Sequence, residues 1–298
     1  MRRVRHEGGR LGRRRRELVI LSIALTGLLG AALPSAASAA GASYVAMGDS
    51  YTSGPGIVPA SPTAPPECGQ SSVNYPHLVA AALGLSLTDV SCGGAKTEDF
   101  TVAQYPDQPP QFDALSSSTE VVTIGMGGND HNLFGTLVEG CTRRDYFAGN
   151  NGSPCKHEYA KFVKQVQEED RGPAEQALRE VHELAPKAKV FIVGYPEITP
   201  VEGYCPTALP WTSGDLKWFR SVEMRGNSEL KAEAKAGGAV FVNTFGPSAG
   251  HNLCQPVGVR WIEPLIEPLT GVPVHPNATG QANDAYDVEE AMLTHGVR

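Results

Sequence analysis

Short apolar runs alternate with longer stretches of helical periodicity along this chain. Apolar runs rich in β-branched residues predict five strands, at 44–47, 85–90, 121–124, 190–193 and 240–242. Apolar residues three and four positions apart predict helices at 75–83, 158–184, 215–236 and 279–293. Continuous apolar strands are buried on both faces, as in a parallel sheet. The alternation therefore predicts a three-layer α/β/α sandwich around a central, mainly parallel five-stranded sheet.

Two segments show neither pattern and are predicted to be long loops. Residues 55–70 and 140–154 are rich in glycine, proline and small polar residues. Loops of this length in a compact domain often bind ligands or act as lids. The helical pattern at 158–184 is also interrupted, at Gly172-Pro173, where proline disfavours continuation of a helix.

Residues 1–39 have the pattern of a secretory signal peptide. Eight arginines fall within the first sixteen residues, a nearly uncharged apolar run follows at 18–33, and Ala37-Ser38-Ala39 is a small-residue cleavage signal. The apolar run is shorter than the roughly 20 residues of a membrane-spanning helix, and no second such run follows. We therefore expect cleavage, secretion by the Sec or twin-arginine route, no stable membrane anchor, and a single domain at 40–298.

Removal of the leader makes the protein strongly acidic. The full chain has 25 Lys and Arg against 32 Asp and Glu. The leader contains eight arginines and two glutamates, so 17 basic and 30 acidic side chains remain. An acidic surface repels phosphate backbones, and we therefore expect no nucleic-acid partner. The mature chain is expected to be a monomer.

All six cysteines lie beyond the leader, at Cys68, Cys92, Cys141, Cys155, Cys205 and Cys254. An even number in an exported chain favours disulfides, and the lack of any C-x-x-C pair argues against a zinc cluster. Six cysteines allow 15 pairings, of which the sequential one is the simplest.

Candidate chemistry follows three of the predicted strands, and a fourth motif precedes the last helix. Gly48-Asp49-Ser50 offers a serine hydroxyl, which needs a nearby base to become a nucleophile. Gly93-Gly94 offers backbone N–H groups, and Gly127-Gly128-Asn129-Asp130 offers an amide, both of which can stabilise an oxyanion. His275 lies in a loop and can serve as the base. Each motif alone also fits an ordinary turn or helix cap.

Together and in this order, the motifs resemble the SGNH hydrolases, also called the GDSL family of lipases and esterases. The resemblance extends from 44 to 291 and is closest to the secreted three-disulfide bacterial branch. Further matching positions are Asn74-Tyr75-Pro76, Gly194-Tyr195-Pro196, Gly250-His251 with Cys254, and Trp261-Ile262. The resemblance implies a flavodoxin-like fold and hydrolysis of lipid or simple carboxylic esters.

The resemblance also implies roles for individual residues. Ser50 is expected to be the nucleophile and His275 the general base. The backbone N–H groups of Ser50 and Gly94 and the side chain of Asn129 are expected to form the oxyanion hole. Asp49 is interpreted as structural, as is Asp130, each carboxylate accepting backbone N–H bonds that hold its loop.

The chain departs from the family in one respect. The family usually has an acidic residue three positions before the histidine, where this chain has Val272. We predict that the main-chain carbonyl of Val272 orients His275 instead, with Glu263, Glu267 and Asp284 as alternative partners.

No cofactor or metal is expected, because the sequence contains neither H-E-x-x-H nor a phosphate-binding or dinucleotide-binding motif. Three alternatives remain open: an acyltransferase or a phospholipase that uses the same site, and a non-catalytic exported binding protein. The last is disfavoured because Ser50, Gly94, Asn129 and His275 are all present.

Overall fold

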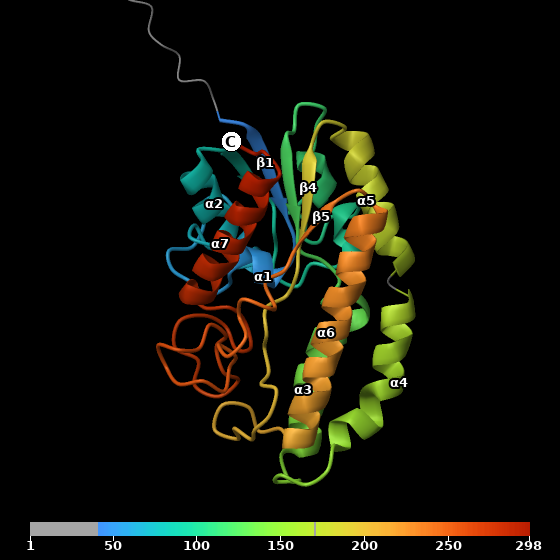
Figure 1. The fold of residues 1–298 in the computed structure, drawn as a ribbon, viewed down its shortest axis with the longest axis vertical. Coiled ribbons are helices and arrows are strands. Elements are labelled where there is room, and N and C mark those ends of the chain that lie inside the picture. The colour runs from blue at the N-terminus through green and yellow to red at the C-terminus, as the bar shows by residue number, and fades with distance from the viewer. Residues whose placement is uncertain (1–40, 170) are drawn as a thin grey trace, which may run out of the picture. The chain divides into compact units, whose positions relative to one another are not determined.

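Five parallel strands form a sheet in the spatial order β2-β1-β3-β4-β5 (Figure 1). The computed structural model describes residues 41–169 and 171–298, so the predicted leader lies outside the described residues. Every neighbouring pair of strands is parallel, which confirms the predicted sheet. The strands are β1 Ser43–Met47, β2 Ser86–Asp89, β3 Val121–Ile124, β4 Lys189–Val193 and β5 Val240–Val242.

Helices cover both faces of the sheet and complete the predicted sandwich (Figure 1). One face packs against α2 and α7, and the other against α5 and the C-terminal part of α6. Alternate strand residues supply the two cores, as strand geometry requires: Tyr44 and Ala46 face α2 and α7, whereas Val45 and Met47 face α5 and α6. The helices are α1 Ser50–Ser53, α2 Tyr75–Leu83, α3 Leu133–Asp145, α4 Pro154–Glu169, α5 Arg171–Leu184, α6 Ser213–Ala236 and α7 Ala278–Thr294.

A third apolar cluster lies beyond the carboxyl edge of the sheet. It joins α3, α4 and the N-terminal part of α6, and Figure 1 shows these helices extending past the strand ends. Trp211 is 1% exposed at its centre, with Phe219 against it at a centroid distance of 5.2 Å. This cluster gives the site a helical wall on one side.

The prediction of a loop at 140–154 is wrong for its first part, because α3 continues to Asp145. Gly140 suggested a loop, yet it lies within the helix and allows α3 to pack closely against α4. A Cβ at this position would lie 2.5 Å from the Tyr159 hydroxyl. Here glycine permits helix packing rather than chain reversal. Gly172 and Pro173, where the helical pattern was predicted to be interrupted, lie within α5 Arg171–Leu184, so the prediction of a break at these residues is wrong.

The three disulfides have the sequential pairing that was the simplest expectation: Cys68–Cys92, Cys141–Cys155 and Cys205–Cys254. The first ties the loop at 55–70 to the segment after β2, and the second joins α3 to α4. The third links the long segments that follow β4 and β5. The long loops near the carboxyl edge are therefore covalently anchored, which limits the unfolded chain and stabilises the fold by roughly 2–4 kcal/mol per bridge.

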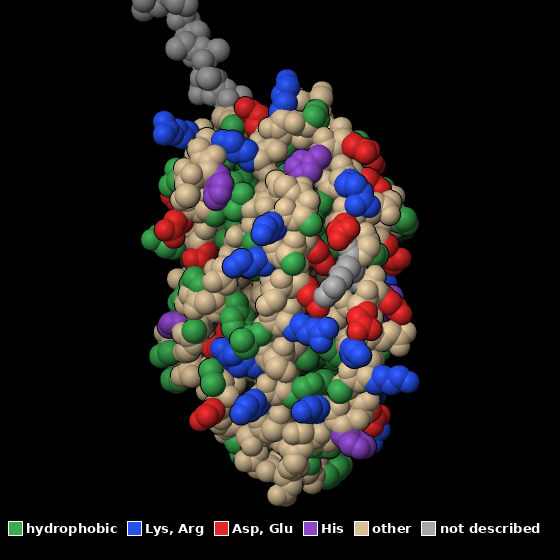
Figure 2. Space-filling model, turned by 45° about the vertical axis from the view of Figure 1, so that its right-hand side comes forward, with side chains coloured by type: hydrophobic (Ala, Val, Ile, Leu, Met, Phe, Trp, Pro, Cys, Tyr) green, Lys and Arg blue, Asp and Glu red, His purple; other side chains and the backbone are tan. Residues whose placement is uncertain are grey.

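Charged side chains of both signs are interspersed on the face shown in Figure 2. Within the part of the chain that the structure describes, i,i+4 ion pairs lie along α3 to α6: Glu139–Arg143, Lys164–Glu168, Glu175–Arg179 and Arg225–Glu229. Such exposed pairs stabilise helices only weakly. Among the described residues, no helix is long and apolar enough to cross a membrane.

Candidate active site

Ser50 begins a short helix at the carboxyl end of β1. Gly48 has φ 151°, and a Cβ there would collide with the Thr52 hydroxyl. Only glycine therefore allows the sharp turn from strand to helix. Asp49 caps the helix by accepting the Tyr51 N–H at 2.8 Å. The turn holds the Ser50 hydroxyl at the sheet edge, where the residue is 8% exposed.

The structure brings Ser50 and His275 into contact across 225 positions of sequence. His275 Nε2 lies 2.7 Å from Ser50 Oγ. His275 precedes α7, whose N-cap Asn277 accepts the N–H groups of Thr279 and Gly280. Its ring packs between Tyr51, at a centroid distance of 5.0 Å, and Phe134, at 5.4 Å. The two predicted catalytic side chains are thus within hydrogen-bonding distance.

The carbonyl that contacts the other imidazole nitrogen is that of Pro273 and not, as predicted, that of Val272. Pro273 O lies 2.8 Å from His275 Nδ1. Val274, between them, has the left-handed φ of 63°, which turns the chain back. A carbonyl reaches less far than a carboxylate side chain, so the partner lies one residue nearer the histidine than in the D-x-x-H pattern.

The alternative acidic partners do not contact the imidazole. The Glu263 carboxylate accepts bonds from Leu269 N–H and Thr270 Oγ1. Its backbone nevertheless fixes the histidine loop: Glu263 N–H donates to His275 O at 2.8 Å, and Val274 N–H donates to Glu263 O at 2.9 Å. Glu263 thus holds His275 through the main chain. None of the bonds described for Glu267 or Asp284 reaches His275.

Two predicted oxyanion donors, Ser50 N–H and Gly94 N–H, find no acceptor among the described residues. Gly94 has φ 78°, a conformation that favours glycine. Asn129 lines the same cavity as Ser50, and its amide donates one hydrogen bond, to Ala95 O at 3.1 Å. An amide NH₂ has two hydrogens, so one remains for a ligand. That these three groups together bind an oxyanion remains a prediction.

Asp49 and Asp130 hold loops, as predicted. Asp130 accepts the backbone N–H of Thr97 at 2.8 Å and its hydroxyl at 2.6 Å. Asp49 also accepts the Tyr195 hydroxyl at 2.6 Å, and that same hydroxyl accepts the Gly128 N–H at 3.0 Å. Burial raises the pKa of Asp49 to about 6.

Tyr195 is the functional-site residue to which the sequence interpretation assigned no role. Its hydroxyl joins the Ser50 turn to the loop that carries Asn129. The Gly194-Tyr195-Pro196 motif was a signal for it, because the tyrosine lies two residues after the end of β4, at the same sheet edge.

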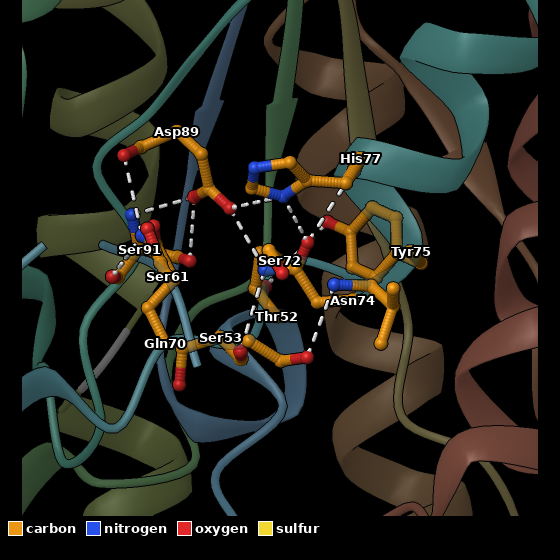
Figure 3. Close-up of polar contacts among 12 residues, drawn as sticks. Thr52, Ser53, Ser61, Gln70, Ser72, Asn74, Tyr75, His77, Asp89 and Ser91 are labelled. Atoms are coloured by element: carbon orange, nitrogen blue, oxygen red, sulfur yellow. Dashed lines mark hydrogen bonds and ion pairs between the residues drawn. The ribbon is translucent and has the colours of Figure 1, made fainter. Parts of the chain in front are cut away.

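A polar network supports the Ser50 helix on its other side (Figure 3). Asp89, at the end of β2, accepts the Ser91 hydroxyl at 2.6 Å and the Asn74 amide at 2.7 Å. The same amide donates to Ser53 O, in the last turn of α1, at 3.3 Å. The network therefore links the nucleophile helix to the segment that leads to Gly94.

A cavity of about 140 Å³ extends from Ser50 between the helices beyond the sheet edge. Its walls come from α3, α6, the start of α5 and the segment that follows β3. The apolar part of its lining comprises Met126, Leu133, Phe134, Leu137, Ala174, Ile198, Phe219, Val222 and Leu230. The cavity suits a hydrocarbon chain, because water gains few hydrogen bonds there.

Glu223 is a carboxyl group in this apolar wall. Its oxygens accept the Ile198 N–H at 2.7 Å and the Thr199 hydroxyl at 2.8 Å. Burial nevertheless raises its pKa to about 8, chiefly through loss of solvation. The side chain is therefore mostly uncharged at neutral pH, which keeps the wall compatible with an apolar ligand.

The chain is similar to several bacterial lipases and to a phospholipase. A sequence profile of the GDSL-like Lipase/Acylhydrolase family matches residues 46–282. Lipase 2 of Streptomyces coelicolor is 40% identical over 275 residues, covering 91% of this chain and 92% of that protein. The solved phospholipase A1 from Streptomyces albidoflavus aligns with TM-score 0.69 at 26% identity, covering 85% of this chain and 99% of that one. The extracellular lipase of Streptomyces rimosus gives TM-score 0.70 at 27% identity, with 84% and 98% covered.

The titration of Glu223 predicts a pH dependence of stability. A carboxyl pKa raised from 4.5 to about 8 means that the folded protein binds more protons than the unfolded chain between these values. Stability is therefore lost as the pH rises through this window, by on the order of a few kcal/mol. Glu223→Gln, which mimics the protonated acid, removes this loss, so the unfolding free energy of wild type should fall relative to the variant between pH 5 and pH 9.

Denaturant unfolding with the disulfides intact measures this difference, with the exposed Glu202→Gln as control. Parallel pH curves for wild type and Glu223→Gln would show that the carboxyl does not titrate in this window.

Proposed function

Because the chain belongs to the GDSL-like lipase/acylhydrolase family and is a carboxylic ester hydrolase, we propose that it acts through an acyl-enzyme on Ser50 with His275 as the general base. The 2.7 Å contact between Ser50 Oγ and His275 Nε2 carries this proposal. Nucleophile and base must be within about 2.6–3.2 Å for proton transfer.

The Pro273 carbonyl determines which imidazole nitrogen can act as the base. A carbonyl only accepts, so His275 Nδ1 carries the hydrogen and Nε2 keeps its lone pair for the Ser50 proton. Ser50 Oγ then attacks the ester carbon, and His275 transfers the proton to the departing alcohol. Water, deprotonated by the same nitrogen, attacks the acyl-enzyme and releases the acid, and the proton returns to Ser50.

The oxyanion that forms at each step needs hydrogen-bond donors. Ser50 N–H and Gly94 N–H have no acceptor among the described residues, and Asn129 has an amide hydrogen to spare. We assign these three groups to the oxyanion. A lost donor of this kind typically raises the barrier by about 2.7–4 kcal/mol.

The apolar cavity beside Ser50 supports esters of apolar acyl groups as substrates. The names of the relatives, which include lipases and a phospholipase A1, support lipid esters in particular. We further infer that residues 1–39 are removed on secretion. The order of basic, apolar and small residues supports this, and the disulfides fit an oxidising compartment.

Turnover of p-nitrophenyl esters, from acetyl to palmitoyl, tests the proposal. Ser50→Ala and His275→Ala should each lower kcat by about 10⁴-fold or more, because the nucleophile and its base act as a unit. His157→Ala, which changes an exposed histidine on α4, should leave kcat unchanged. A folded Ser50→Ala variant that retains wild-type turnover would refute the mechanism.

The pH profile should show His275 as a weak base. Burial lowers its pKa below 6.5, against the smaller opposite effect of the Pro273 carbonyl. Because only the neutral imidazole accepts a proton, kcat/KM should rise with pH and reach its plateau with a midpoint below 6.5.

Rates from pH 4.5 to 8 with a short soluble ester give this midpoint. Because Asp49 titrates near 6 in the same site, the imidazole C–H resonance of His275 should be followed by NMR over the same range. A titration midpoint of His275 at or above pH 6.5 would contradict this prediction.

A further inference from the structure

Gly226 is a glycine in the middle of a long helix, where glycine is among the least favourable residues. It lies well inside α6 Ser213–Ala236, far from either cap. Its backbone is ordinary α-helix, so no left-handed conformation requires glycine. A glycine in such a position calls for another explanation.

Close packing does not supply that explanation. At two other helical glycines it does: a Cβ at Gly140 would lie 2.5 Å from the Tyr159 hydroxyl, and one at Gly280 would lie 2.6 Å from Trp261 O. For Gly226, apart from its two chain neighbours and the backbone of its own helix, no atom in the described part of the chain lies within 4 Å of the corresponding position. The space beside this residue is open.

That space belongs to the cavity that begins at Ser50. Spacings of three and four positions recur among the residues of α6 that line it, which therefore share one broad face of the helix: Phe219, Val222, Glu223, Gly226, Asn227, Glu229, Leu230 and Glu233. With a rise of 1.5 Å per residue this stripe is ~21 Å long. Gly226 lies at its centre and gives the wall a recess, where a larger residue would give it a protrusion.

We propose that Gly226 keeps open the path of a long, unbranched acyl chain, and that the side chain at this position sets the acyl length that the enzyme accepts. This inference rests on the proposed function, since the cavity receives the acyl group only if Ser50 is the nucleophile. A straight hydrocarbon fits the observations because the facing walls supply Met126, Leu133 and Ala174. A methyl or isobutyl group at position 226 would narrow the path of a long acyl chain. A short acyl group would end before it reaches this position and would not be affected.

The test compares kcat/KM on p-nitrophenyl acetate, butanoate, dodecanoate and palmitate for wild type, Gly226→Ala and Gly226→Leu. For Gly226→Leu, kcat/KM should fall by about 10–200-fold on the two long esters and should stay within about twofold of the wild-type value on acetate. Gly226→Ala should show a smaller shift in the same direction. It should also melt a few degrees higher, because alanine favours the helix.

Ser228→Leu is the matched control. It adds the same side chain two residues later, about 200° around the helix on the exposed side, and should leave the acyl-length profile unchanged. The inference is overturned if folded Gly226→Leu keeps the wild-type profile, or if it loses activity equally on acetate and palmitate. It is also overturned if wild type itself turns over only acetate.

Ser50→Ala, assayed on the same four esters, separates the two claims. If Ser50→Ala is inactive while Gly226→Leu retains long-chain turnover, the inference about Gly226 fails and the mechanism stands. If Ser50→Ala remains active, the proposed function fails first. Should Gly226→Leu not fold, the Gly226→Ala profile decides the question.

Discussion

Parallel pairing of all five strands is the constraint from which the site follows, because it brings every strand end to one edge of the sheet. Met47 pairs with Ile124, and Ile124 with Ile192, so the residues that follow β1, β3 and β4 emerge side by side. Ser50, Asn129 and Tyr195 come from these three strand ends. The Tyr195 hydroxyl, bonded to Asp49 and to Gly128 N–H, ties the loops together above the edge.

His275 reaches the same edge from the last loop, and its position depends on main-chain bonds. The backbone of Glu263 pairs with Val274 and with His275 itself, and the Tyr51 hydroxyl donates to Val274 O at 2.6 Å. A neutral carbonyl orients the ring without adding a negative charge to stabilise the imidazolium. The loop therefore supplies orientation, while burial keeps the base neutral.

The strands, the order of the motifs and the disulfide pairing could be predicted because each depends on local pattern or on chain connectivity. The partner of His275 could not, because the left-handed turn at Val274 determines whether Val272 or Pro273 faces the ring. Helix α3 was not predicted, and its last part was interpreted as a loop because Gly140 serves packing against Tyr159, a contact between separate helices. The role of Tyr195 could not be predicted either, because it depends on two loops that meet only in the folded chain.

The account as a whole requires that Ser50 be an activated nucleophile at neutral pH. Reaction of the folded, disulfide-intact protein with a fluorophosphonate, followed by peptide mapping with mass spectrometry, measures this directly. The account predicts a single adduct, located on Ser50, that no longer forms after acid unfolding. An adduct on a different serine, or none on the folded protein, would contradict it.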